Sequence, residues 1–207
     1  TGAELLAHVI LLNKVTINQD SFGEIISLTD SAILELRYYR NNILHTFILP
    51  SLVCRLLERN AKISQDDLLS QIQRLVQLLK TDLFLWQSAE DVELQVNAVC
   101  QFLTEQNIAK QSKAGFWSLS PDDETRAKVR LIAECVNETM QRFAIITSLL
   151  SQLAPIKKSE FDEKVVAIAQ RLSVLNNINA PEFIDKKAQS TLILAMKDQG
   201  YIALDDN

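Results

Sequence analysis

His8 and His45 are the two histidines of this 207-residue chain, so any imidazole chemistry depends on them. Neither has a serine, cysteine or carboxylate placed by the local sequence to form a nucleophile–base pair. The chain has no GxGxxG, GxxxxGK[ST] or HExxH pattern, and its four glycines are too few for a glycine-rich phosphate loop. We therefore expect no catalytic residue, no metal site and no cofactor within this chain.

Carboxylates and cysteines are the other reactive groups. Acidic clusters at 66–67 and 122–124 precede segments with apolar residues at helical spacing. Acidic side chains at the start of a helix interact favourably with the positive end of its dipole. The acidic pair at 205–206 belongs to a terminal tail. The three cysteines are odd in number and far apart, and each lies in an apolar helical pattern without a CxxC pair (Cys54, Cys100, Cys135). We therefore expect the acidic clusters at 66–67 and 122–124 to mark the starts of helices. We expect the three cysteines to be buried thiols of a protein in a reducing compartment.

The segment from Glu35 to Asn60 combines basic, aromatic and apolar residues. Between Arg37 and Asn60, four arginines stand against one glutamate, in a chain of net charge −5. The apolar run from Ile43 to Leu57 is shorter than the roughly 20 residues that span a bilayer. Two interpretations stay open, a helix buried against protein on most faces and a helix at a membrane interface with arginines near phosphates.

Helical periodicity and turn signals outline the elements around this segment. We expect Pro50 to kink the central helix or to restart it near Leu49–Pro50. The pattern predicts a helix at 3–13, a short strand at 15–17, a β-hairpin at 24–36 and the central helix at 38–58. It then predicts a helix from the Ser64/Asp67 capping box to 79, a helix at 89–104, strands at 108–111 and 116–119, and a helix at 120–153 stopped by Ala154-Pro155. A helix after the Ser159/Asp162 box, a helix at 179–198 and a short terminal strand complete the pattern.

The fold class is therefore mainly α, a multi-helix domain with a few short β-hairpins. A helix, a polar turn and a β-prone residue recur at LLNKVTI, LTEQNIA and MKDQGYIA, which resembles the recognition helix and wing of winged-helix folds. Winged-helix-like subunits are one interpretation, and helices separated by small hairpins are the other. We treat 1–207 as one helical domain with possible subunits 1–86 and 87–207. The acidic net charge disfavours nucleic acid as a partner.

Two ordered segments resemble the bacterial glycerol-3-phosphate 1-O-acyltransferase family. In LRYYRNNILHTFILPSLV, a YYRN sequence leads into an apolar helix that ends in a PSL-like turn. In AQRLSVLNNINAPEFIDKKAQSTLILAMKDQGYI, an RLSVL and INAPEF pattern precedes the last helix. The segments between and before them also fit, so the resemblance covers essentially the whole chain.

The resemblance implies a membrane-associated enzyme of phospholipid synthesis. Its family transfers an acyl group from acyl-CoA or acyl carrier protein to sn-glycerol 3-phosphate, using an H-x4-D motif. Here Asn13 and Pro50 stand where that aspartate would follow His8 and His45. The chain also begins without an initiator methionine or signal pattern. We therefore expect a soluble, non-catalytic C-terminal region, downstream of an acyltransferase domain on the cytoplasmic face of the bacterial inner membrane.

The resemblance and the local pattern together select five residues as interface or substrate-proximal. A polar-aromatic cluster beside an apolar helix suits docking to the enzyme's own N-terminal acyltransferase domain (Tyr38, Tyr39, Arg40, Asn41 and His45). Alternatively, an arginine there could approach a phosphate of acyl-CoA or glycerol 3-phosphate. The competing interpretation is a winged-helix-like protein-interaction or regulatory module without enzymatic activity.

Overall fold

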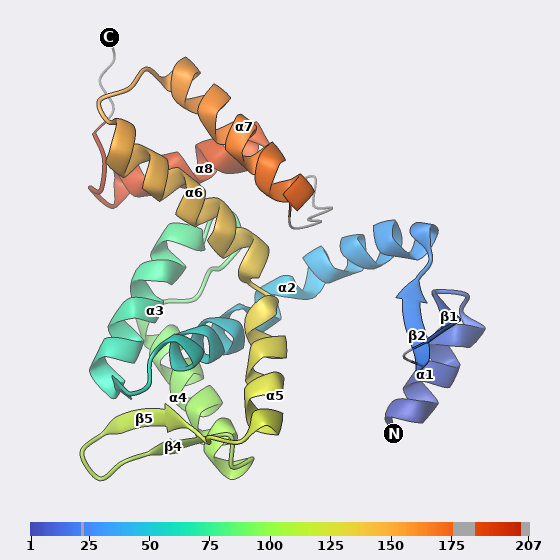
Figure 1. Cartoon of the computed structure of the whole chain (residues 1–207). Helices are drawn as coiled ribbons and strands as arrows, with labels where there is room; N and C mark the ends of the chain where they lie inside the picture. The colour runs from blue at the N-terminus through green and yellow to red at the C-terminus, as the bar shows by residue number, and fades with distance from the viewer. Residues whose placement is uncertain (22, 176–184, 204–207) are drawn as a thin grey trace. The chain divides into compact units, whose positions relative to one another are not determined.

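The computed structural model describes residues 1–21, 23–175 and 185–203 of this chain, and it is mainly helical with two small antiparallel sheets, which confirms the expected fold class (Figure 1). The chain divides into two compact units, Thr1–His45 and Thr46–Asn207. This boundary lies within one helix, and the subunits 1–86 and 87–207 stay a prediction. In chain order the elements are α1 (Gly2–Leu11), β1 (Val15–Asp20), β2 (Gly23–Leu28), α2 (Asp30–Arg59), β3 (Ile63–Ser64), α3 (Gln65–Leu79), α4 (Ala89–Glu105), β4 (Ala109–Gln111), β5 (Phe116–Leu119), α5 (Asp123–Glu134), α6 (Asn137–Leu153), α7 (Lys158–Leu175) and α8 (Lys186–Asp198).

The N-terminal unit consists of α1, the β1–β2 hairpin and the start of α2. The hairpin pairs Val15 with Leu28 and turns at Gly23, whose φ of 122° suits glycine. The hairpin predicted at 24–36 was wrong, because the Thr29-Asp30-Ser31 cluster begins a helix instead of a turn. Thr29 Oγ1 accepts a hydrogen bond from the Ala32 backbone N–H at 3.2 Å, as an N-cap residue does.

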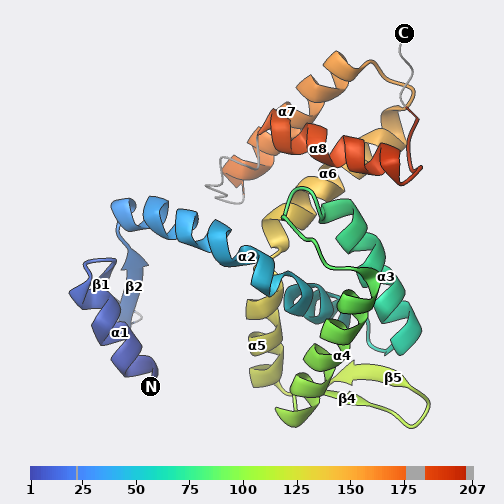
Figure 2. The ribbon, with the colours of Figure 1, turned by 180° about the vertical axis from the view of Figure 1, so that it is seen from behind.

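The C-terminal unit contains a sheet with the strand order β3-β5-β4. Ile63 of β3 pairs with Trp117 of β5, and Ala109 of β4 pairs with Leu119 of β5. Along the chain, the later part of α2 is followed by β3, α3, α4 and the β4–β5 hairpin, and α4 lies beside this hairpin in two opposite views (Figures 1 and 2). Winged-helix folds have the same order of elements, namely a helix, a strand, two helices and a hairpin. In these folds, too, the first strand pairs with the last.

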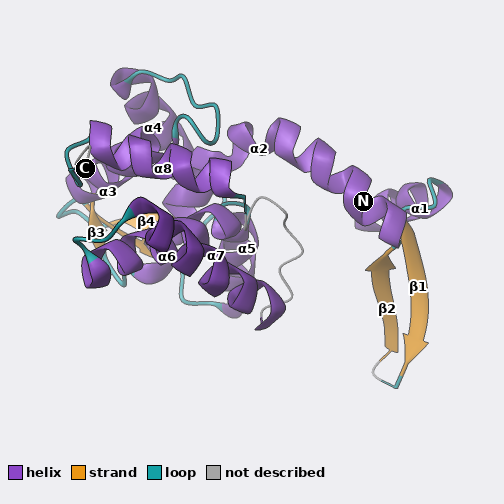
Figure 3. Cartoon of the chain, turned by 90° about the horizontal axis from the view of Figure 1, so that it is seen from above, coloured by secondary structure: helices purple, strands orange, loops and turns teal. Residues whose placement is uncertain are grey.

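A second packed region of the same unit joins α6, α7 and α8 to the end of α3 (Figure 3). Ile146 of α6 is fully buried, and Val165 of α7 and Leu192 of α8 lie with it in one apolar cluster. Apolar residues at helical spacing on each helix supply this core, which is what an amphipathic pattern predicts.

Several expected boundaries were wrong. α2 continues through Pro50, so the helix does not restart there, and the alternative of a kink at Pro50 stays a prediction. The buried Ser51 hydroxyl donates to the Phe47 carbonyl at 2.6 Å, one turn earlier. The helix expected over 120–153 is two helices, because α5 ends at Glu134 and α6 begins at Asn137. α7 begins at Lys158, so Ser159 lies inside its first turn.

The C-terminal end differs from the expectation as well. α8 begins at Lys186, and the start expected at 179 lies outside the described residues. Residues 201–203 form no strand, although a glycine turn at Gly200 does follow α8, with a φ of 73°.

Candidate functional site

The five residues selected from the sequence all belong to the part of α2 within the N-terminal unit. Tyr38 and Tyr39 are 67% and 61% exposed. Their ring centroids lie 5.8 Å apart with an interplanar angle of 73°, an edge-to-face arrangement favoured by aromatic quadrupoles. Two large aromatic side chains therefore stand together on the surface of this unit.

Helical geometry distributes the five residues over two sides of α2. Tyr38 and His45 are seven residues apart and share one side, since seven residues make about two turns. Tyr39 shares the other side with Leu36 and Ile43, which are 37% and 53% exposed. Arg40 and His45 are half-buried, and the side chain of Asn41 lies outside the described part of the chain. An exposed apolar stripe on α2 therefore runs through Tyr39, and its role stays a prediction.

Contacts within the N-terminal unit hold the start of α2 against the hairpin. Lys14 and Glu35 form an ion pair between the residue before β1 and the second turn of α2. The Thr29 backbone N–H donates to the Lys14 carbonyl at 3.2 Å. The tyrosine-bearing helix is thus tied to the hairpin by backbone and side-chain contacts.

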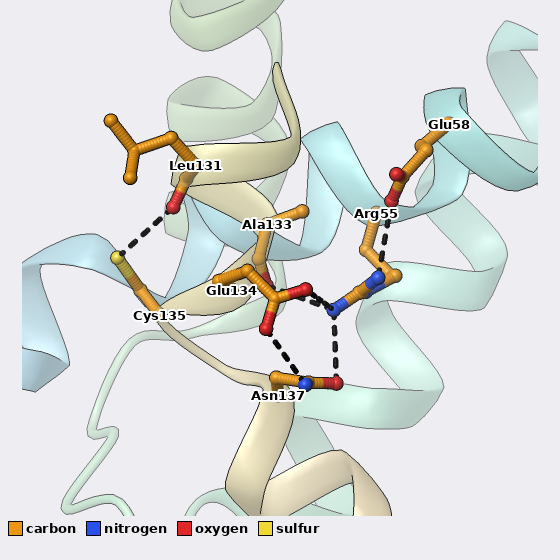
Figure 4. A network of polar contacts seen from close by, with 7 residues as sticks. All are labelled: Arg55, Glu58, Leu131, Ala133, Glu134, Cys135 and Asn137. Carbon is orange, nitrogen blue, oxygen red and sulfur yellow. Dashed lines mark hydrogen bonds and ion pairs between the residues drawn. The ribbon is translucent and has the colours of Figure 1, made fainter. Parts of the chain in front are cut away.

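A polar network in the C-terminal unit centres on Arg55 of α2 (Figure 4). Its guanidinium donates to Glu58 at 3.1 Å, to Asn137 Oδ1 at 3.0 Å and to the Ala133 carbonyl at 3.4 Å, and it lies 3.5 Å from Glu134. Asn137 Nδ2 in turn donates to Glu134 at 2.8 Å. Arg55 therefore binds the junction between α5 and α6, where a carbonyl of the last turn of α5 needs a partner.

This role of Arg55 could not be predicted from the sequence. The excess of arginines is a local feature, whereas the partners at the α5–α6 junction lie about eighty positions further along the chain. The network satisfies a helix end and joins two elements, so we interpret it as structural. No local sequence pattern predicts that Arg55 contacts the junction between α5 and α6.

A second ion pair, Arg142 of α6 with Asp82 of the segment after α3, is buried, with side chains 8% and 14% exposed. Burial raises the pKa of the Asp82 carboxyl above its ordinary value, although the Arg142 charge and hydrogen bond act in the opposite direction, and Asp185 adds to the rise. Gln189 of α8 is also buried, and its side-chain amide has no hydrogen-bond partner among the described residues. These groups form costly polar elements of a helical core.

A groove of about 570 Å³ lies along α6 and α7. Its lining is largely apolar, with amide and hydroxyl groups from α6 (Gln141, Ala144, Ile145, Ser148, Leu149, Gln152, Ile168 and Leu172). Neither histidine of the chain lines it, and Ser148 therefore has no imidazole base there.

The cysteines divide into two kinds. Cys54 and Cys100 are buried, and burial raises the pKa of their thiols to about 12 and about 11. Cys135 is exposed, which corrects the expectation that all three are buried. The reason is the end of α5 at Glu134, which places Cys135 in the junction and not within a continuous helix.

None of the described helices combines the length and apolar character needed to cross a membrane. Among the same residues, no three His, Cys, Asp or Glu side chains gather into a group that could hold a metal ion.

Comparison with known proteins identifies relatives over the whole chain. A family model described as "Glycerol-3-phosphate acyltransferase C-terminal region" matches residues 1–205. A protein of Colwellia psychrerythraea named "Glycerol-3-phosphate acyltransferase" is 60% identical over 207 residues, which cover all of this chain and 26% of that protein. Proteins of the same name from Shewanella sp. (strain MR-4) and Aeromonas hydrophila are 38% and 37% identical, over 98% and 96% of this chain and 24% of each relative. The chain thus spans about a quarter of the length of the curated relatives that it matches.

Proposed function

This chain belongs to the family of glycerol-3-phosphate acyltransferase C-terminal regions, and we propose that it is a non-catalytic docking region of such an enzyme. The parent enzyme would transfer an acyl group from acyl-CoA or acyl carrier protein to sn-glycerol 3-phosphate, at the cytoplasmic face of the bacterial inner membrane. The partner of this region would be the enzyme's own N-terminal acyltransferase domain.

The absence of the H-x4-D motif supports a non-catalytic role. Asn13 and Pro50 follow His8 and His45 at the position where the family carries aspartate. The Arg55 network and the Arg142–Asp82 pair join elements that are remote in sequence, and the α6–α7 groove contains no nucleophile–base pair. The chemistry of the parent enzyme therefore belongs to another part of its chain.

The observation that carries the docking proposal is the exposed tyrosine pair on α2. Tyrosine has a large apolar ring and a polar hydroxyl, and it is enriched where protein surfaces meet. Leu36 and Ile43 extend the apolar surface along the side of α2 that carries Tyr39. A stripe of this kind on one helix suits a groove or flat face of a folded partner better than solvent.

Tyr39→Ala in the full-length enzyme tests this docking surface. A tyrosine at the centre of an interface contributes about 1–2 kcal/mol of binding free energy. We expect limited proteolysis to release the C-terminal region faster, and membrane recovery and specific activity to fall. Arg74→Ala, which removes an exposed arginine of α3, is the control and should behave as wild type. Wild-type proteolysis, membrane recovery and kinetics in Tyr39→Ala would refute the docking role.

Arg40→Ala separates docking from the second role considered for this arginine. Contact with a phosphate of acyl-CoA or glycerol 3-phosphate would raise the KM for that one substrate and leave proteolysis unchanged. Loss of docking would change proteolysis and activity together. Wild-type KM, kcat and proteolysis in Arg40→Ala would show that Arg40 contributes neither to docking nor to binding a substrate phosphate.

The winged-helix order of the C-terminal unit favours one alternative, a protein-interaction or regulatory module without enzymatic activity. In helix-turn-helix proteins that bind DNA, the second helix enters the major groove. The corresponding helix here is α4, which carries acidic residues and neither lysine nor arginine (Glu90, Asp91, Glu93 and Glu105). Since phosphates repel such a helix, the alternative is a protein-binding module. A gel-shift titration at low salt should show no DNA binding, and a shifted band would contradict this.

A further inference from the structure

Three of the described helices end in the same hydrogen-bonded turn. After α4, the Asn107 N–H donates to the Thr104 carbonyl at 2.9 Å, and the Ile108 N–H donates to the Leu103 carbonyl at 2.8 Å. Asn107 has a positive φ of 57°. This pair of bonds around a left-handed residue is the Schellman motif of helix ends.

The ends of α1 and α8 repeat this geometry. After α1, the left-handed residue is Asn13, with a φ of 53°, and after α8 it is Gly200, with a φ of 73°. In both turns, the N–H of the left-handed residue donates to the carbonyl three residues earlier, and the next N–H donates to the carbonyl five residues earlier. The donors and acceptors are Asn13 to Ile10 and Lys14 to Val9 after α1, and Gly200 to Lys197 and Tyr201 to Met196 after α8. The three turns coincide with the three sequence repeats LLNKVTI, LTEQNIA and MKDQGYIA, so they provide an internal alignment of the helices.

This alignment reveals a difference in burial. Cys100 and Leu103 of α4 are each 2% exposed, and the residues aligned with them on α8, Ile193 and Met196, are each 6% exposed. On α1 the aligned residues are Leu6 and Val9, which are only half-buried, and the neighbouring Leu5 is 68% exposed. No residue of α1 is buried. The side of α1 that corresponds to the core side of α4 and α8 is therefore less covered than that side of either helix.

The hairpins show the same difference. By the pairing register, β1 and β2 correspond to β4 and β5, and Ile26 occupies the position of Trp117. Trp117 is 7% exposed and pairs with Ile63 of β3 on the outer edge of its hairpin. Ile26 is 52% exposed, and its sheet has two strands among the described residues. An exposed edge strand that carries isoleucines is a template for pairing with a further strand.

We propose that α1, β1 and β2 are the second half of a winged-helix subunit, whose first half is the segment of the parent chain directly before Thr1. In the complete subunit the corresponding half is residues 46–88, a helix, a short strand and a helix. The missing half would cover Leu5, Leu6 and Val9 with its helices and pair its strand with β2. This inference rests on one part of the proposed function, namely that the chain belongs to a longer parent enzyme. It does not depend on docking through the tyrosines of α2. The relatives, about four times as long as this chain, have ample room for such a segment.

Site-specific photo-cross-linking in the full-length enzyme tests this proposal. The photoreactive residue p-benzoylphenylalanine replaces Leu6 in one variant and Ile26 in another, and mass spectrometry identifies the captured peptides. Both variants should capture peptides from the segment directly before Thr1, over a length similar to that of residues 46–88. Ala7, which is exposed and aligns with the exposed Gln101 of α4, is the matched control position and should not capture that segment.

Capture of the acyltransferase domain, of lipid or of another protein at Leu6 and Ile26 would overturn the proposal, and so would absence of capture. Hydrogen exchange supplies a second measurement on the full-length enzyme. Leu6→Asp should accelerate exchange of the β2 amides by about tenfold or more, whereas Ala7→Asp should not. Equal exchange in the two variants would contradict the proposal. Tyr39→Ala should leave the Leu6 cross-link intact, so failure of docking and failure of this subunit are distinguishable.

Discussion

At the scale of single residues, the cysteines differ in accessibility. The thiolate is the reactive form of cysteine, and burial raises the pKa of Cys54 to about 12 and that of Cys100 to about 11. We expect iodoacetamide to label Cys135 rapidly in the folded chain, and the two buried thiols only as fast as the protein opens. Peptide mass spectrometry resolves the sites, and Cys135→Ser should abolish the rapid phase. Comparable labelling of Cys54 in the folded chain would contradict the expectation.

The buried ion pair between Arg142 and Asp82 supports a prediction about stability. Arg142→Met leaves the Asp82 carboxylate buried without its counter-ion, which costs about 3–5 kcal/mol in comparable pairs. We expect urea unfolding at neutral pH to show this loss. Lys164→Met, which breaks an exposed pair with Glu160, is the control and should change stability by less than about 1 kcal/mol.

The pH dependence of that loss follows from the raised pKa of Asp82. Because the folded pKa lies above the ordinary value of 3.8, the folded chain binds the Asp82 proton more tightly than the unfolded chain does. This contribution favours folding below 3.8 and is lost as the pH rises through the folded pKa. Removing the Arg142 charge raises the pKa of Asp82 further, so the deficit of Arg142→Met should shrink near pH 4. An equal deficit at neutral and acidic pH would show that Asp82 stays ionised.

At the scale of elements, the junction between α5 and α6 depends on a residue of a third helix. Arg55→Met keeps the aliphatic stem and removes the bonds to the Ala133 carbonyl and to Asn137. Hydrogen bonds that involve a charged group contribute about 1.5–3 kcal/mol, so we expect a loss of about 2 kcal/mol in urea unfolding. Exchange of the amides at the start of α6 should accelerate as well. Arg74→Met on α3 should change neither quantity, and an unaltered junction in Arg55→Met would refute the capping role.

The same junction shows how distant contacts determine helix boundaries. Apolar periodicity continues across residues 120–153, and no glycine or proline marks a break near Cys135. Val136 makes no side-chain cap for α6. The ends of the two helices are stabilised by Arg55 and Asn137, and these contacts exist only once the elements have packed.

At the scale of the whole molecule, the two units differ in how much core they have. Ala32 is the one buried apolar residue among the described side chains of the N-terminal unit. The C-terminal unit has an extensive core, including residues of α3, α6, α7 and α8. Local opening is easiest where few apolar groups are buried. We expect the β1–β2 amides of this 207-residue chain to exchange faster than the β4–β5 amides, by about tenfold or more.

Hydrogen exchange with mass spectrometry measures this difference within one sample. The β4–β5 hairpin is the internal control, because it has the same type of pairing and a third strand on its outer edge. Equal protection of the two hairpins would show that the N-terminal unit is complete without further residues. That result would also remove the basis for a missing half-subunit.

Features that depend on neighbours along the chain could be predicted from the amino-acid sequence. Ser64 caps α3, the β4–β5 hairpin turns at Gly115, and α6 ends before Pro155. Each depends on hydrogen bonds or backbone preferences within a few residues, which a local pattern reveals. The family was also recognisable, because two ordered motifs lie far apart in one chain.

Contacts between distant segments, and the surfaces that stay exposed, become visible only in the folded chain. The Arg55 network, the Arg142–Asp82 pair and the exposure of Cys135 all follow from the packing of elements that are remote in sequence. For the candidate surface, the sequence identified Tyr38 to His45, but helical geometry divides them between two sides of α2. The same apolar pattern is buried in α4 and α8 but only partly covered in α1. The physical reason is that burial depends on what packs against a residue, and residue type alone cannot specify that.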